Sequence, residues 1–546
     1  MIIKMNNDYC DKTAFTFYRA RHFFSSVIRR LTKRTTLLLT IAVSVCALQA
    51  HAATLRMAFD NNVVSLDPHE LLSESSLQFS HLVYDPLIRW KKDGSLEPRL
   101  ATKWEQIDPK TVRFYLRKDV QFITGNAFSA KDVAYTINRL KGSPDFRAMF
   151  DTIQGTKIID LYTIDIISVA PNPLTLNVMT YVFPMDRVYF KDRDKIVKYG
   201  ETFASKNVSG TGAYYIEARK TGVKTVLKRN PHYWDKESKG NVDKLILTPI
   251  RNASTRLAAL LSGDVDFIFP ISPIDIPRMK QQKGIKVRTL QGTRIALLHM
   301  NEERNLALKD IRVRKAINLA INQKLIVDKI LKGYGTPAGQ LSADRFLGHV
   351  SSLKPEYNLA KAKALLEDAG YKDTLSVSMM ASNNRYVDDK LVAEAIASML
   401  SKVGIKVNLK TLPKAQYYQE FDRRSADLMM VTWQSDTLDS NNLFEFLVAC
   451  PDGSSGLGAY NASEYCNPSI NQAIGQANTE MNPERRIRLL QSVERTLHND
   501  AAVVPLFWQS LNWASKENVH FENVVNDQNY PYIDRLIITE NKGTRD

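Results

Sequence analysis

The chain has 546 residues, of which 44% are hydrophobic and 24% are charged, and its formal net charge is +16. This composition is ordinary for a globular protein, and the length exceeds what one hydrophobic core supports, so several domains are expected. Residues 1–52 carry eight Lys/Arg and two Asp, which leaves a net charge of +10 on the rest. These later charges are scattered and form no long basic block, which argues against a nucleic-acid-binding protein.

The first 52 residues have the pattern of a secretory signal peptide. Basic residues at 29–34 precede an apolar run at 37–48, and Ala50-His51-Ala52 is a cleavage signal of the A-x-A type. The apolar run is too short to be a comfortable membrane anchor. Cys46 lacks the small preceding residue of a lipoprotein, and one Arg pair is weak evidence for a twin-arginine signal. We predict a Sec-type signal peptide cleaved after Ala52, and a periplasmic mature protein.

The first half of the mature chain mixes short strands with capped helices. Hydrophobic patterning predicts strands at 55–59, 112–122 and 223–228, and helices at 76–87, 133–140 and 254–261. Ser129 and Asp132 form a capping-box pattern before the second of these helices. Gly263 follows the third helix, where a glycine commonly ends a helix.

The second half alternates helices and strands more regularly. Strands are predicted at 294–301, 375–380, 405–409, 428–433 and 503–508, and helices begin at 310, 322, 358, 389 and 483. This alternation predicts an α/β lobe with a largely parallel sheet. The first and last of these strands bracket the lobe and would connect it to the rest of the chain.

Two loops at strand ends contain the candidate ligand-binding residues. Asp436 and Asp439 follow the buried strand 428–433, and Arg385 follows the strand 375–380. Ligands of open α/β sheets collect at the carboxyl ends of strands. One acidic and one basic group suit a zwitterion, since a guanidinium binds a carboxylate in a bidentate manner. The alternatives are that both aspartates cap the next helix and that Arg385 is simply exposed.

The sequence offers no catalytic or metal-binding motif. A Gly-x-Ser-x-Gly elbow, a His-Glu-x-x-His pair and a dinucleotide-binding fingerprint are all missing, and none of the seven histidines after residue 53 has ligand spacing from another His or Cys. We therefore predict no enzyme activity, no catalytic residues, no cofactor and no metal. Cys450 and Cys466 remain after cleavage and are predicted to form a disulfide, with two free thiols as the alternative.

Several of these stretches resemble family 5 of the extracellular solute-binding proteins, the large dipeptide and oligopeptide receptors of bacterial ABC importers. Trp433-x-x-Asp436, with Asp439 and Asn442-Leu-Phe behind it, resembles their peptide-binding segment. The order Trp104-Glu, Phe-x-Leu-Arg117, Gly125 and Ala-x-Asp-Val resembles their scaffold, and the likeness covers nearly all of the chain after residue 53. Most of the other residues in the Asp436 loop differ from the dipeptide receptors, and Ala213 stands where the family has Pro.

The resemblance implies ligand contacts for four residues. Asp436 would pair with the ligand's ammonium group and Arg385, which is followed by Tyr386, would hold its carboxylate. Trp433 and Asp439 would complete the ligand-binding segment. The dipeptide receptors also have a similarly placed cysteine pair, which supports the Cys450–Cys466 bridge.

The implied fold is a two-lobed periplasmic binding protein of type II, in the large cluster with an extra domain and a two-stranded hinge. Domain I would comprise 53–85, 205–293 and 509–546, domain II (the extra domain) 86–204, and domain III (the second lobe) 294–508. The implied function is a monomeric receptor that captures short peptides and delivers them to an inner-membrane ABC permease with its ATPase subunits. Nickel or a metallophore, with His299 or His349 as contacts, glutathione and a glycan are the alternatives.

Overall fold

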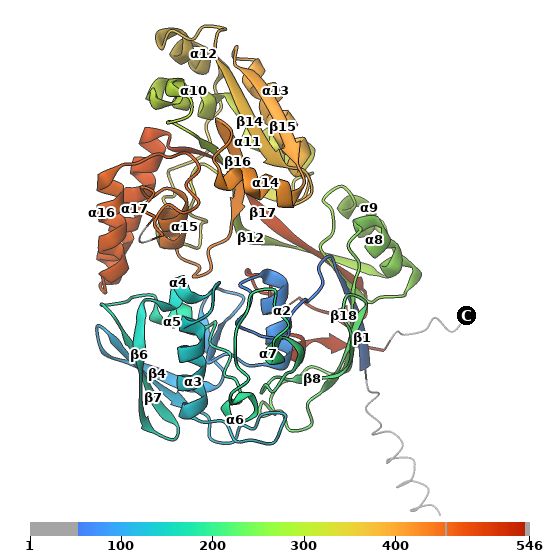
Figure 1. Ribbon diagram of the computed structural model, residues 1–546. Helices are drawn as coiled ribbons and strands as arrows, with labels where there is room; N and C mark the ends of the chain where they lie inside the picture. Colours follow the sequence, from blue (N-terminus) through green and yellow to red (C-terminus); the bar gives the residue numbers. More distant parts are fainter. Residues whose placement is uncertain (1–52, 454–455, 523, 541–546) are drawn as a thin grey trace, which may run out of the picture. The chain divides into compact units, whose positions relative to one another are not determined.

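The computed structural model describes residues 53–453, 456–522 and 524–540, so the predicted signal peptide lies outside the described residues. Its dominant element is an 11-stranded mixed sheet (Figure 1). The strand order is β15 (Lys406–Leu412), β14 (Ser376–Ser382), β16 (Leu428–Trp433), β12 (Ile285–Met300), β17 (Val503–Lys516), β11 (Phe267–Phe269), β1 (Ala53–Phe59), β10 (Val242–Pro249), β9 (Lys224–Arg229) and β8 (Tyr214–Lys220), and β13 (Gly335–Pro337) pairs with β17.

Three smaller sheets and a set of helices complete the fold. The small sheets are β4 (Ala101–Asp108), β5 (Thr111–Leu116), β7 (Thr163–Ser168) and β6 (Ile153–Asp160); β2 (Ile88–Trp90) with β3 (Leu96–Pro98); and β18 (Val519–His520) with β19 (Ile537–Ile538). The helices of the first half are α2 (Glu74–Val83), α3 (Ala130–Lys141), α4 (Arg147–Phe150), α5 (Thr175–Met179), α6 (Arg187–Phe190), α7 (Phe203–Lys206), α8 (Ala253–Ser262) and α9 (Ile276–Gln281). Those of the second half are α10 (Ile311–Ala320), α11 (Gln323–Leu325), α12 (Leu359–Asp368), α13 (Asp389–Ser401), α14 (Lys414–Asp422), α15 (Ser440–Leu447), α16 (Pro468–Thr479) and α17 (Pro483–Asp500). Throughout the described residues, no helix is long and apolar enough to cross a membrane.

Strands β12 and β17 join the two halves of the large sheet. They pair antiparallel from Ile285 opposite Lys516 to His299 opposite Val503, with a break in register between Gln291 and Ile295. Both strands are about twice as long as predicted. Only their apolar halves gave a clear sequence signal, because side chains in the other half of β12 are mainly half-exposed.

The backbones of the two strands approach closely at the register break. A Cβ atom on Gly292 would lie 2.6 Å from the carbonyl oxygen of Gln509, a contact that side chains do not tolerate. Glycine at this position therefore lets β12 pass beside β17 where the regular ladder is interrupted.

Most predicted helix starts are confirmed by their caps. The side chains of Asp310, Asn322 and Asn358 each accept a backbone N–H at the first turn of the following helix. Ser129 and Asp132 form the predicted capping box of α3. These signals are local, since a polar side chain caps the helix that directly follows it.

Three local predictions need correction. The helix predicted at 76–87 ends at Val83, because the residue before Pro86 is driven away from helical geometry. Strand β5 ends at Leu116 rather than at residue 122. The sheet of the second half is parallel only across β15, β14 and β16, because the long strand β12 runs antiparallel to β16.

The buried apolar side chains form separate clusters. One large cluster is made by residues between 55 and 269 together with residues 513–536, and a smaller one lies around α8 and α9. Two further clusters consist of residues between 295 and 508. The domain boundaries given above stay predictions.

The structure contains the Cys450–Cys466 disulfide, which links the end of α15 to the start of α16 and spans 16 residues of sequence. Such a bridge restricts the unfolded chain and thereby stabilises the fold.

The double variant Cys450→Ser/Cys466→Ser should lower the free energy of unfolding by about 3 kcal/mol, as for closure of a loop of this length. Urea unfolding measures this, with dithiothreitol-treated wild type as the matched control. Thiol titration of the denatured, unreduced chain starting at Ala53 should find no free thiol, and two free thiols would contradict the bridge.

Candidate functional site

Hydrogen bonds to its main-chain atoms hold the loop between β16 and α15 in place. The hydroxyl of Tyr181 donates a hydrogen bond of 2.5 Å to the carbonyl oxygen of Asp436. The side-chain amide of Asn177 donates a hydrogen bond of 2.7 Å to the carbonyl oxygen of Thr437. Inside the loop, Ser435 Oγ accepts from the N–H of Asp439 at 3.1 Å. The backbone is therefore fixed without using the Asp436 side chain.

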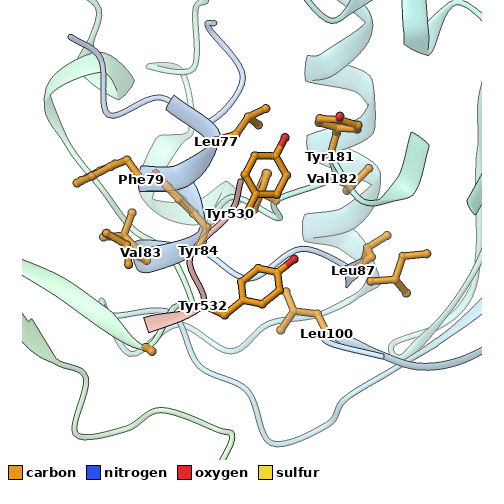
Figure 2. Close-up of a cluster of buried hydrophobic side chains, with 14 of the residues drawn as sticks. Leu77, Phe79, Val83, Tyr84, Leu87, Leu100, Tyr181, Val182, Tyr530 and Tyr532 are labelled. Carbon is orange, nitrogen blue, oxygen red and sulfur yellow. The ribbon is translucent and has the colours of Figure 1, made fainter. Parts of the chain in front are cut away.

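Tyr181 belongs to a cluster of buried aromatic and aliphatic side chains (Figure 2). Tyr530 lies close to it, and the hydroxyl ends of both rings point to the same side of the cluster in Figure 2. The amide of Gln528 also reaches the Asp436 carbonyl oxygen, at 3.4 Å. The loop thus rests on residues from two distant parts of the chain.

The carboxylate of Asp436 is half-buried and accepts no hydrogen bond from any described residue. Burial raises its pKa to about 7, and the positive charge of Arg294 acts in the opposite direction. A carboxylate withdrawn from water without a bonded partner is unfavourable and is readily stabilised by a cation or a hydrogen-bond donor.

Arg294 connects this loop to helix α2. Its guanidinium donates to Gln434 Oε1 at 2.8 Å and lies 3.5 Å from Glu74 Oε2. Glu74 also accepts from the side-chain amide of Asn529 at 2.6 Å. Burial raises the pKa of Glu74, whereas Arg294 lowers it. Neither Glu74 nor Arg294 is predictable as a site residue from the sequence, because 220 residues separate them and neither lies in a recognisable motif.

Arg385 lies in the loop after β14, as predicted. The N–H groups of Arg385 and Tyr386 both donate to Asp389, which fixes the loop at the start of α13. The guanidinium lies over the ring of Tyr386, 4.7 Å from its centroid, and its Nε is buried without a hydrogen-bond partner in the described chain. Its charge lowers the pKa of Glu74, so Arg385 acts in the same electrostatic environment as Arg294.

Trp433 forms part of the wall beside the loop. Its indole Nε1 donates to Asn442 Oδ1 at 2.9 Å. Its ring is tilted against Tyr460, at 4.7 Å between centroids, and against Phe446, at 5.4 Å. The ring is therefore fixed and half-buried.

Asp439 takes the alternative role considered above, that of a helix cap. Its carboxylate accepts from the N–H of Asn441 and forms two hydrogen bonds with Arg486, at 2.7 and 2.8 Å. The side chains of both ion-pair partners are only 3% exposed. Asp439 therefore supports the loop from inside the protein and offers no free group to a ligand.

The two histidines considered as metallophore contacts occupy different surroundings. His299 is fully buried beside Ser463 and Phe421, and burial lowers its pKa to about 3. His349 is half-buried, with Nδ1 3.0 Å from the carbonyl oxygen of Ser342. The part of the chain that the structure describes contains no group of three or more His, Cys, Asp or Glu residues that could hold a metal ion.

Comparison with known proteins identifies the family. The sequence profile of the bacterial extracellular solute-binding proteins, family 5, matches residues 95–455, which is more than half of the chain. The chain belongs to this family.

The relatives of this chain are named for different ligands. It is 28% identical to heme-binding protein A of Haemophilus influenzae, over 78% of this chain and 82% of that protein. It is 24% identical to the dipeptide-binding protein of Escherichia coli, over 89% of this chain and 97% of that protein. The fold matches the periplasmic binding protein DppA of Helicobacter pylori in complex with the peptide STSA, with a TM-score of 0.74 and 23% sequence identity. The match covers 89% of this chain and 98% of that chain. The predicted α/β binding-protein fold is thereby confirmed.

The two loop aspartates should differ in their effect on stability. Asp439→Ala leaves the buried guanidinium of Arg486 without its partner and should lower the free energy of unfolding by about 3–5 kcal/mol. Asp436→Asn removes a carboxylate whose pKa is raised on folding. That carboxylate costs stability as the pH rises from its unfolded pKa towards 7, so the Asn variant should be at least as stable as wild type at pH 7.5.

Urea unfolding of both variants at pH 7.5 and pH 4 tests this contrast. The advantage of Asp436→Asn should disappear at pH 4, where the wild-type carboxyl is protonated in the folded protein. An Asp439→Ala variant as stable as wild type would contradict the support role of Asp439.

Proposed function

We propose that the protein captures short peptides by their two charged ends. The proposal rests on the half-buried Asp436 carboxylate. This carboxylate has no hydrogen bond within the described residues and can pair with an ammonium group. Arg385, with its unpartnered Nε, supplies the cation for the peptide carboxylate. The dipeptide-binding relative and the peptide complex with the same fold support this ligand class.

In this proposal the ligand closes two lobes and undergoes no chemistry. The break in register of β12 at Gly292, beside Gln509 of β17, is the proposed hinge, because few backbone groups need to change there. A peptide bound between the lobes favours the closed form by its contacts with both of them. The inner-membrane permease of an ABC importer, with its ATPase subunits, then receives the peptide from that form, and the receptor acts as a monomer without a cofactor.

The charge of the site favours a peptide or glutathione over the other ligands considered. Asp436 favours a solute with a cationic end, which a peptide has and which glutathione shares. A metal chelate would use histidine contacts, but His299 is enclosed in the protein interior. One relative is named for heme, yet the site described here offers a carboxylate and a guanidinium, which suit a zwitterion.

Asp436→Asn should weaken peptide binding by about 2–5 kcal/mol, as for removal of one partner of a buried charge pair. Isothermal titration calorimetry with a mixture of short peptides, and then with single peptides, measures the loss. The exposed Asp422→Asn is the matched control and should bind as wild type does. N-acetylation of the peptide should cost wild type as much as the Asp436 substitution, and equal affinity for free and acetylated peptides would contradict the assignment.

Binding should also weaken as the pH falls through 7. Asp436 attracts the ammonium group only when it is ionised, and its pKa is raised to about 7. Well below that pH the affinity should fall about tenfold per pH unit, because one proton must leave before the ligand binds. Calorimetry between pH 5.5 and 7.5 tests this, and Asp436→Asn should show a much flatter profile. A flat wild-type profile would contradict the role of Asp436.

A further inference from the structure

A cavity that is open to solvent extends from the candidate site into the first half of the fold. It lies between helix α2 and the carboxyl ends of β1 and β10. Phe79 and Leu82 of α2 form one wall, and Met57 of β1 and Leu247 of β10 form the other. All four side chains are at least 92% buried, so the cavity reaches the hydrophobic core.

The inner end of the cavity is rigid. Phe269, which lines it, stacks on Trp513 with 4.2 Å between ring centroids. Trp513 stacks in turn on Phe267 at 4.9 Å. Stacked aromatic rings in a packed core do not rearrange to fill the space, so the cavity is a fixed feature of the fold.

The mouth of the cavity belongs to the candidate site. Glu74 lines the cavity and contacts Arg294. Asp60 also lines it, and although burial raises the pKa of Asp60, Arg256 and then Arg385 lower it. The cavity therefore opens among the charges that surround the proposed ligand, and Lys224 lines it together with the two carboxylates.

We infer that this cavity is a subsite for a bulky aliphatic or aromatic side chain of the bound peptide, and that its apolar walls disfavour an acidic side chain. The inference rests on the proposed function, because it assumes that the peptide termini are held at Asp436 and Arg385. The apolar walls supply the affinity, since burial of a large apolar side chain removes its surface from water. The same walls supply the selectivity, since a carboxylate buried among them would lose its contact with water.

A matched peptide series tests the subsite. Peptides of one length, with free termini, carry Ala, Leu, Phe or Asp at one position at a time, and calorimetry with wild type measures each affinity. At one position Leu and Phe should bind about ten- to a hundredfold more tightly than Ala, and Asp should bind most weakly. Binding that is indifferent to these side chains would overturn the subsite but leave the proposed function intact. Failure of every peptide to bind would overturn both.

Two substitutions locate the effect. Thr248→Phe, at the carboxyl end of β10, and Thr225→Phe, on β9, each place a large ring in the cavity from a different strand. Either variant should bind the Ala peptide as wild type does and lose the preference for Leu and Phe. The exposed Thr221→Phe is the matched control and should keep it. If both folded cavity variants keep the preference, it arises elsewhere and the inference fails; if one variant does not fold, the other decides alone.

Discussion

The antiparallel pairing of β12 with β17 is the constraint on which the rest of the structure depends. These two strands are the only part of the large sheet that belongs to both of its halves in the described chain, because the order β15-β14-β16 lies on one side and β11-β1-β10 on the other. The position of the loop between β16 and α15 follows from the same pairing. Trp433, the last residue of β16, lies opposite Ile295, so the loop begins beside Arg294.

That register explains the electrostatics of the site. Arg294 directly precedes the residue that pairs with Trp433, and its guanidinium contacts Gln434 of the loop and Glu74 of α2. The positive charge of Arg294 thus lowers the pKa of Asp436, which follows β16, and that of Glu74 in α2. Arg294 does not fully offset the effect of burial on Asp436, whose pKa is still raised to about 7. The unsatisfied charge is the property on which the proposed recognition of an ammonium group depends.

The sequence predicted what is encoded locally. Helix caps such as Asp310 and Asn358 act on the residues that follow them, and β16 is a continuous buried run, so each is visible in a short window. The different roles of Asp436 and Asp439 are not local. Asp439 is neutralised by Arg486, which lies 47 residues further along the chain, and no pattern near Asp439 indicates that pairing. Glu74 and Arg294 were missed for the same reason, since only the folded sheet brings them together.

The hydrogen bond from Tyr181 to the carbonyl oxygen of Asp436 has a consequence for the evolution of the receptor. Position 436 is anchored through its peptide group, so a new side chain there changes the chemistry offered to a solute while the loop keeps its path. A change of side chain at this position can therefore arise without loss of the loop's anchoring hydrogen bond.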